Sequence, residues 1–572
     1  MTSTHAEPID RELDELRTGA RRWADLGAGE KAALLRAVRT TVAHEAEAWS
    51  EAGAAAKGVA GTPLAGEEWI SGPWAVLYAL NRYIQTLDEI ATTGAPAIAP
   101  SRVRTRSDGQ VVVDVFPVSP YDRLLLNGIR AEVRMQRGVT PATLPSTMGA
   151  WYREQAHAPR VALVLGAGNI SSIAPLDVLY KLVADGAVCI LKMNPVNDYL
   201  GPIFQRALRP LVDAGYLRFA FGGTDVGQYL CAHPLVDEIH ITGSDKTYDA
   251  IVFGDGPDAA ERKRRNDPVL TKPITSELGN VSPTIVVPGP WSDADLRFQA
   301  ENIVTQKLHN GGFNCIASQV VVLPSAWDGT QRLLAEIEAV LGDISDRPAY
   351  YPGAAQRSAR IIDGRTAVVS AGRNGDGFVP RSLLRVSADS TNDPAFRNEA
   401  FASVLAATEL DGDVATYLDR AVTFANDTLW GTLGANIIVH PKTMHAFAPA
   451  LDRAIASLRY GCVGLNAWTG VGYFICETPW GAYPGHTAND IQSGTGVVHN
   501  SHLFSRSEKS VVYAPFAPFP RSIAGYGGAL LPKPPWFVTN RMAAAVGRAL
   551  CAFETKKTPL AAAEVALLAM RA

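Results

Sequence analysis

Residues 159–243 alternate short apolar runs with longer stretches in which apolar residues recur at helical spacing. We predict strands in the apolar runs at 161–165, 188–191, 217–221 and 237–242. Helices are predicted between them, over 175–184 and 203–214. Buried strands that alternate with helices indicate a parallel sheet covered by helices, and such sheets bind ligands in the crevice beyond the carboxyl ends of their strands.

A second unit begins after residue 277. The apolar run 283–287 predicts another strand, and Ser292 with Asp295 forms a capping-box pattern at the start of a helix. That helix is expected to continue to His309 and to stop at Gly311-Gly312. Cys315 follows almost at once, before a strand-like run at 320–323. The pattern therefore places a cysteine in a glycine-rich loop between a helix and a strand.

The two ends of the chain differ from this middle part. Residues 32–52 predict a helix, and the β-branched run 111–116 predicts a strand with which residues 130–139 could pair. Residues 515–535 contain several prolines and are expected to have no regular secondary structure. The apolar tail 560–570 predicts a docked terminal helix, with peripheral membrane contact as the weaker alternative because Glu564 interrupts the run.

Composition narrows the class of protein. A chain of 572 residues exceeds what one hydrophobic core usually supports, so at least two domains are expected. Its net charge of −4 gives no basic field that would attract nucleic acid. The six cysteines form no C-x-x-C pair, so we predict neither a metal site nor a disulfide framework. Without a secretory signal or a spanning apolar run, a cytoplasmic protein with no integral membrane segment is expected.

Two segments carry candidate chemistry. The segment Gly166-Ala167-Gly168-Asn169-Ile170-Ser171 nearly matches the dinucleotide fingerprint, in the expected place between a strand and a helix. Alone this pattern is weak, because tight turns also use glycine for steric reasons. Cys315 has the polar, glycine-rich surroundings that suit a nucleophilic thiolate, whereas Cys189 lies in an apolar run and is expected in the core.

Several motifs, taken together, resemble the aldehyde dehydrogenase superfamily in order and approximate spacing between about residues 161 and 481. They are Thr242-Gly243-Ser244, Ser276-Glu277-Leu278-Gly279-Asn280, Gly312-Phe313-Asn314-Cys315, Asn398-Glu399-Ala400-Phe401, Ala425-Asn426-Asp427-Thr428, Gly461-Cys462-Val463-Gly464 and Pro479-Trp480-Gly481. The resemblance implies an α/β fold of the aldehyde dehydrogenase type, with a parallel Rossmann-type cofactor domain, an α/β catalytic domain and an oligomerisation hairpin.

The same resemblance divides the chain into parts. We expect a helical N-terminal part of the cofactor domain at 1–102, the oligomerisation hairpin and a connector at 103–155, the Rossmann-type NAD(P)-binding domain at 156–276, the catalytic domain at 277–460, a return segment and substrate tunnel at 461–490, and a C-terminal extension at 491–572. The hairpin implies a homodimer or a homotetramer.

The implied activity is the NAD(P)-dependent oxidation of an aldehyde to a carboxylic acid. Cys315 would attack the aldehyde carbonyl to give a thiohemiacetal, and loss of hydride to the nicotinamide would leave a thioester. Asn169, with the backbone N–H of Cys315, would hold the developing oxyanion. Glu277 would be the general base that activates the water for hydrolysis.

The resemblance also assigns cofactor-binding residues. Lys192 would bind the adenosine ribose, Glu399 the nicotinamide ribose with Phe401 beside it, and Gly243 and Ser244 belong to the cofactor-binding turn. Family members that are strict for NAD often have an acid three positions after the lysine, where this chain has Pro195. With no carboxylate there to repel a 2′-phosphate, NADP stays open, although NAD is the cofactor that we expect.

The chain departs from the family at three places, which identify a divergent branch. Asn169 follows Gly-Ala-Gly in place of the usual Pro-Trp, Tyr248 replaces a second glycine after Thr-Gly-Ser, and Ala402-Ser403 replaces the usual Gly-Pro. The tunnel segment contains Trp468, Tyr473 and Phe474, and with Phe313 these rings suggest either an apolar aldehyde or ordinary core packing.

Two alternatives remain open. A coenzyme A-acylating dehydrogenase or acyl reductase would use the same scaffold, although such enzymes commonly lack the general-base glutamate that this chain has at Glu277. A binding protein without catalysis could also keep the fold. Such a protein would not need a thiol opposite a base.

Overall fold

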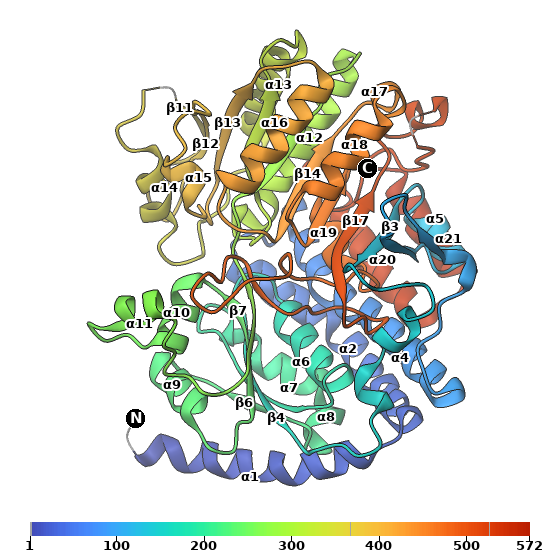
Figure 1. Ribbon diagram of the computed structural model, residues 1–572, viewed down its shortest axis with the longest axis vertical. Coiled ribbons are helices and arrows are strands. Elements are labelled where there is room, and N and C mark those ends of the chain that lie inside the picture. The colour runs from blue at the N-terminus through green and yellow to red at the C-terminus, as the bar shows by residue number, and fades with distance from the viewer. Residues whose placement is uncertain (1–2, 367, 526) are drawn as a thin grey trace.

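The computed structural model describes residues 3–366, 368–525 and 527–572. Two β-sheets, each covered by helices, account for most of the molecule, with the smaller sheet in the lower half of Figure 1 and the larger one in the upper half. This arrangement confirms the predicted α/β class.

The smaller sheet has six strands in the order β16-β8-β7-β4-β5-β6. The five strands β8, β7, β4, β5 and β6 run parallel to one another, whereas β16 is antiparallel to β8. The bounds are β4 Val161–Leu165, β5 Val188–Lys192, β6 Leu217–Ala220, β7 Glu238–Gly243, β8 Ile274–Leu278 and β16 Gly494–Thr495. The predicted apolar runs therefore form strands, because a parallel sheet between two helical layers buries both of its faces.

The helices of this half are α1 Ser3–Asp25, α2 Ala28–Ala56, α3 Gly66–Trp69, α4 Ala75–Thr93, α6 Ile173–Val183, α7 Gly201–Ala207, α8 Arg209–Asp213, α9 Thr224–Ala232, α10 Asp245–Phe253 and α11 Ala259–Arg265. The prediction of a single helix over residues 203–214 was wrong. The chain forms α7 and α8 instead, with Leu208 outside helical geometry at their junction. Pro210 in the first turn of α8 has no N–H to continue the hydrogen-bond ladder, so the helix is interrupted.

The larger sheet has eleven strands in the order β1-β2-β3-β17-β15-β14-β9-β10-β13-β12-β11. The bounds are β1 Val103–Thr105, β2 Val111–Phe116, β3 Arg130–Met135, β9 Ser282–Val286, β10 Ser318–Pro324, β11 Val368–Ala371, β12 Arg381–Arg385, β13 Val404–Leu410, β14 Gly434–Ile438, β15 Cys462–Leu465 and β17 Ser507–Tyr513. The strands from β17 to β12 are parallel and form the centre of this sheet.

The predicted pairing of residues 111–116 with 130–139 is confirmed by the antiparallel pair β2 and β3. Strand β17 connects this hairpin to the parallel strands, because it pairs antiparallel with β3 and parallel with β15. The hairpin thus extends the large sheet of its own chain. The proposed domain boundary at residue 490 falls before β16 and β17, which add one strand to each sheet.

The remaining helices are α5 Pro120–Leu125, α12 Asp293–Leu308, α13 Gly329–Asp343, α14 Ala354–Ile362, α15 Pro394–Arg397, α16 Val414–Asp427, α17 Pro441–Ala446, α18 Ala448–Ser457, α19 Thr469–Phe474, α20 Ala543–Lys556 and α21 Pro559–Ala569. Most of them cover the larger sheet or lie at the ends of its strands, whereas α20 packs against α2, α3 and α4, and α21 packs against α20 and α5. The capping box predicted at Ser292 is present, since Ser292 Oγ accepts from the Asp295 N–H.

The apolar tail forms α21, which docks against α20 and α5 as predicted. Its inward side chains are mostly alanine, whereas Leu560 and Leu567 are exposed. Among the residues that the structure describes, no helix is both long and apolar enough to cross a membrane.

Candidate active site

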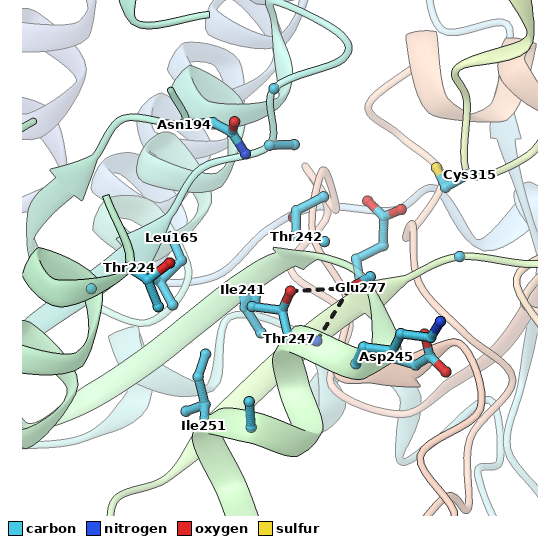
Figure 2. A pocket seen from close by; sticks show the side chains of 18 of the residues that line it. Leu165, Asn194, Thr224, Ile241, Thr242, Asp245, Thr247, Ile251, Glu277 and Cys315 are labelled. Atoms are coloured by element: carbon cyan, nitrogen blue, oxygen red, sulfur yellow. Dashed lines mark hydrogen bonds between the residues drawn. The ribbon is translucent and has the colours of Figure 1, made fainter. Parts of the chain in front are cut away.

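The site lies where the chain passes from one sheet to the other. Glu277 is the fourth residue of β8 in the smaller sheet, and β9 of the larger sheet begins five residues after it. Cys315 stands between the end of α12 and the start of β10. Figure 2 shows the Glu277 carboxyl group pointing toward the Cys315 side of the cavity. The two sheets thus bring a thiol and a carboxyl group together.

The loop before Cys315 has a backbone that needs glycine. Asn310, Gly311 and Gly312 all have positive φ, at 55°, 70° and 82°. A Cβ on Gly312 would lie 2.6 Å from the carbonyl oxygen of Ala402, a contact that no side chain can make. The predicted helix stop is therefore confirmed, and it turns the chain sharply enough to place Cys315 at the cavity.

Cys315 is half-buried and lines this cavity, whereas the other five cysteines are buried. Burial raises the pKa of the Cys315 thiol well above its usual value, and the negative charge of Glu277 raises it further. Sulfur is thus protonated at rest, and it needs a neighbouring base to become a nucleophile.

Glu277 has the proton affinity that such a base requires. Burial raises its pKa to about 7, the neighbouring Cys315 thiol lowers it in part, and the charge of Asp177 and the Trp480 side chain have smaller, opposite influences. A carboxyl group with a pKa near neutrality can both accept and release a proton at physiological pH. An ordinary surface glutamate could not, because it would stay ionised.

Asn169 contacts the loop that carries Cys315 through both its side chain and its backbone. Its Nδ2 donates to the carbonyl oxygen of Phe313 at 3.0 Å, which leaves the second amide hydrogen free to donate. The backbone carbonyl oxygen of Asn169 accepts from Lys57 Nζ at 2.9 Å, from Asn310 Nδ2 at 3.1 Å and from the Tyr350 hydroxyl at 3.0 Å. The turn after β4 is therefore fixed against the loop that carries Cys315.

A cavity of about 1170 Å³ continues from Cys315 along the carboxyl ends of β4 to β7. All of the site residues predicted from the sequence line it, namely Asn169, Lys192, Gly243, Ser244, Glu277, Cys315, Glu399 and Phe401. This size exceeds the range typical for drug-sized ligands and suits a dinucleotide. The crevice beyond the strand ends is thus where the strand pattern predicted it.

The part of the cavity wall formed by α10 and the end of β5 offers groups that suit phosphates and ribose. Ser244 caps α10 through its Oγ, which accepts from the Thr247 N–H at 3.1 Å, and the start of this helix faces the cavity. Free N–H groups and the helix dipole favour anions there. Burial lowers the pKa of Lys192, while the nearby Asp225 and Asp198 raise it.

Tyr248, which replaces a family glycine, does not obstruct this wall. Its side chain is buried in a small cluster with Ile241, Val252 and Phe253. The neighbouring α10 residues Lys246, Thr247 and Ala250 line the cavity instead. Because the tyrosine side chain turns into the core, the helix can still lie close to a ligand.

Glu399 also lines the cavity, within reach of the charge of Cys315, and lies against the chain segment after β8. The backbone N–H of Asn280 donates to Glu399 Oε1 at 3.3 Å. A Cβ on Gly279 would lie 2.2 Å from Glu399 Oε2, so a side chain at this position would make the carboxyl end of Glu399 move. Burial raises the pKa of Glu399 to about 8. Arg357 supports the segment that carries Glu399, because it donates to the Phe401 carbonyl oxygen at 3.1 Å.

The aromatic residues predicted to line a substrate tunnel lie behind the cysteine loop. The rings of Trp468 and Phe474 are 6.3 Å apart, and Trp468 Nε1 donates to the Ile316 carbonyl oxygen at 3.3 Å. The Tyr473 hydroxyl is 3.0 Å from Ser172 Oγ. These rings are buried beside the nucleophile, and their role in substrate binding stays a prediction.

Sequence reasoning missed the residues that support the site from a distance. Lys57, Asn310 and Tyr350 hold the Asn169 turn, and Asp177 influences Glu277. A lysine just after a helix and an aspartate within an apolar helix are weak signals. Both become informative only when the fold places them beside the site.

Comparisons with known proteins agree with this geometry. The family model described as "Aldehyde dehydrogenase family" matches residues 129–481. The betaine aldehyde dehydrogenase of Vibrio vulnificus is 24% identical over 370 residues, which cover 60% of this chain and 64% of that protein. The match therefore spans less than two thirds of that relative's length.

Solved structures share the fold. The NAD-dependent aldehyde dehydrogenase from Sinorhizobium meliloti has a TM-score of 0.58 at 17% identity, over 89% of this chain and 87% of that one. Aldehyde dehydrogenase C from Pseudomonas syringae, solved with NAD+ and octanal, has a TM-score of 0.58 at 19% identity, over 90% of each chain. Since the family model matches more than half of the sequence, the chain belongs to the aldehyde dehydrogenase family.

Proposed function

We propose that this protein oxidises an aldehyde to a carboxylic acid, with Cys315 as the nucleophile and Glu277 as the general base. The observation that carries the proposal is the position of these two groups in one cavity, next to a crevice of dinucleotide size. Glu277 would first take the thiol proton, so that the thiolate can attack the carbonyl carbon to form a thiohemiacetal.

The residues present fit a nicotinamide dinucleotide. Gly279 has no side chain to displace the Glu399 carboxyl group from its place beside the cavity. The α10 N-terminus and Lys192 supply hydrogen-bond donors elsewhere in the same cavity. Glu399 and Lys192 would bind the two riboses, and Gly243 and Ser244 would lie against the diphosphate. When bound, the nicotinamide accepts the hydride that leaves the thiohemiacetal carbon. We propose NAD, because Asp198 and Asp225 offset the charge of Lys192 and would repel the extra phosphate of NADP.

The chain's own groups would then release the product. The free amide hydrogen of Asn169 and the backbone N–H of Cys315 would donate to the oxygen that gains negative charge. Glu277 would release the thiol proton to solvent in the cavity and then take a proton from water as the water oxygen attacks the Cys315 thioester carbon. The carbon–sulfur bond breaks, the departing sulfur takes the proton back from Glu277, and the acid leaves with the thiol restored.

We propose an apolar aldehyde as substrate, since Trp468, Tyr473 and Phe474 surround the back of the cysteine loop. The octanal bound to the Pseudomonas syringae relative supports an aliphatic chain. A panel of hexanal, benzaldehyde and a charged semialdehyde, each with NAD and with NADP, tests this through absorbance of the reduced cofactor. Preference for the charged aldehyde would contradict it.

The nucleophile is tested by comparing Cys315→Ala with Cys189→Ala, a matched variant of a buried cysteine away from the cavity. We expect Cys315→Ala to lose turnover and Cys189→Ala to keep it. Intact-protein mass should show an acyl adduct on Cys315 only. Turnover by Cys315→Ala would mean that catalysis does not use this thiol. If coenzyme A is added and acyl-coenzyme A forms instead of free acid, the acylating alternative replaces hydrolysis.

We retain a cytoplasmic homodimer or homotetramer as a proposal, to be tested by light scattering. The hairpin β2 and β3 is already paired with β17 of its own chain. Assembly would therefore use side chains of the hairpin more than its inner backbone edge.

A further inference from the structure

The two donors proposed for the oxyanion belong to different parts of the chain. The Asn169 amide lies in the turn after β4 of the smaller sheet, and the Cys315 N–H lies in the loop before β10 of the larger sheet. A donor stabilises an oxyanion only within hydrogen-bond distance of the place where the charge develops. The rate therefore depends on the groups that fix the two segments relative to each other.

The side chain of Asn310 joins these two segments. Asn310 Nδ2 donates to the backbone carbonyl oxygens of Asn169 and Phe313, at 3.1 Å each. Asn169 Nδ2 donates to the same Phe313 carbonyl oxygen at 3.0 Å, and Phe313 precedes Cys315 by two residues. One primary amide thus holds the Asn169 turn and the cysteine loop together, with one N–H directed at each.

The oxygen of the Asn310 amide is held as firmly as its nitrogen. Asn310 Oδ1 accepts from Lys57 Nζ and from the Tyr350 hydroxyl, at 3.1 Å each. Lys57 is itself fixed by Glu68, at 2.8 Å from its Nζ. A cation and a hydroxyl on the amide oxygen draw electron density from the nitrogen, which strengthens its two N–H groups as donors.

Asn310 has one orientation available to it. The residue has no exposed surface, and both hydrogens and both lone pairs of its amide are used by the contacts above. A rotated amide would leave buried groups unpaired, which is unfavourable. Its φ of 55° lies in the left-handed region that asparagine and glycine tolerate better than other residues.

We propose that Asn310 is a positioning residue that fixes the Asn169 amide relative to the Cys315 N–H, so that both donors reach the same oxyanion. The inference rests on the proposed function, because this oxyanion forms when the Cys315 thiolate attacks a carbonyl group. Both N–H groups of the Asn310 amide donate to backbone carbonyls. Asn310 therefore acts on the rate through Asn169.

Two reactions of Cys315 separate the position of the oxyanion donors from the general state of the loop. p-Nitrophenyl acetate acylates the thiol through a tetrahedral intermediate with a negatively charged oxygen, and nitrophenolate absorbance follows this step without a cofactor. Iodoacetamide alkylates the same thiol by displacement of iodide, and no oxyanion forms. Intact-protein mass verifies single modification, since the other five cysteines are buried.

The test variant is Asn310→Gly, because glycine adopts a φ of 55° without strain and only the amide is removed. Asn266→Gly is the matched control, since Asn266 has a φ of 53° at the exposed end of α11. Asn169→Ala and the double variant complete a cycle that shows whether the two residues act together. Tyr350→Phe is a milder variant, which removes one contact to Asn310 Oδ1.

We expect Asn310→Gly to slow acylation about tenfold or more, a part of the ~10²–10³-fold that one oxyanion donor supplies. Alkylation by iodoacetamide should stay at the wild-type rate. In aldehyde oxidation kcat should fall, whereas the KM for NAD should not change. Added to Asn169→Ala, Asn310→Gly should have almost no further effect, because the donor that it positions is already gone. Asn266→Gly should match wild type, and Tyr350→Phe should show a smaller loss of acylation with alkylation unchanged.

Three outcomes would overturn the positioning role. They are acylation of Asn310→Gly at the wild-type rate, a parallel loss of acylation and alkylation, and a full loss added to that of Asn169→Ala. If Asn310→Gly does not fold, Tyr350→Phe decides the question, and unchanged acylation in this variant overturns the proposal. Failure of the proposed function gives a different result, because wild type would then not be acylated on Cys315 or Asn169→Ala would be acylated as fast as wild type.

Discussion

Glu277→Gln should inactivate the protein and, at the same time, stabilise it in a pH-dependent way. Glu277 is buried, and burial raises its pKa from 4.5 to about 7. Between these values the native state holds a proton that the unfolded chain has released. Stability therefore falls as pH rises through this window, and above pH 7 the native state carries a buried charge.

The size of the effect follows from the two pKa values. A rise from 4.5 to about 7 corresponds to about 3 kcal/mol, at ~1.4 kcal/mol for each factor of ten. Glutamine is neutral at every pH and avoids this cost. The gain in unfolding free energy of Glu277→Gln should be about 2 kcal/mol larger at about pH 8.5 than at about pH 5.5.

Scanning calorimetry at a series of pH values measures this difference as the gap between the melting temperatures of variant and wild type. Glu51→Gln, which changes an exposed acid on α2, is the control and should show no such trend. In the same series, wild-type hydrolysis should rise about tenfold between about pH 6 and pH 8. A melting-temperature gap that is independent of pH would refute the assignment of a raised pKa to Glu277.

Three further predictions follow from the site. Gly279→Ala should raise the KM for the cofactor by about tenfold or more with a smaller effect on kcat, since the new Cβ would displace Glu399; unchanged cofactor affinity would contradict this. Asn169→Ala should lower kcat about 100-fold or more with little change in melting temperature, since it removes an oxyanion donor; a loss of under tenfold would argue against that role. Lys57→Met should destabilise the protein by about 3–5 kcal/mol because Glu68 loses its buried partner, and adding Glu68→Gln should recover part of the loss in a denaturation assay; a second change that only adds to the damage would refute the pairing.

The parts of the fold that the sequence predicted are those governed by local chemistry. The runs at 161–165 and 188–191 became strands because their residues are apolar on both faces, and Gly311-Gly312 ended α12 because only glycine tolerates that backbone. Pro210 was visible in the sequence as well. Its effect on the predicted helix follows from its missing N–H.

The rest depends on contacts between distant parts of the chain. Lys57 contacts Asn310 across 253 residues, and Asp177 contacts Thr242 across 65. Nothing in either local segment determines these pairs, because they arise from the order and register of the strands. For the same reason the position of β17, between the hairpin and β15, could not be predicted from its own residues.

The continuous pairing of β3, β17 and β15 has a consequence for how the protein behaves at high concentration. The backbone edges of the larger sheet are left to β1 and β11, which have three and four residues. At β1, Arg104 pairs with Glu132 and Asp114 across the neighbouring strands, so this rim is short and charged. The other rim, β11, has no charged residue and exposes Val369, so its protection comes from its short length alone. Short edge strands are poor templates for another extended chain. A broad sheet of this kind should therefore resist fibril-like stacking, even though most of its strands are strongly apolar.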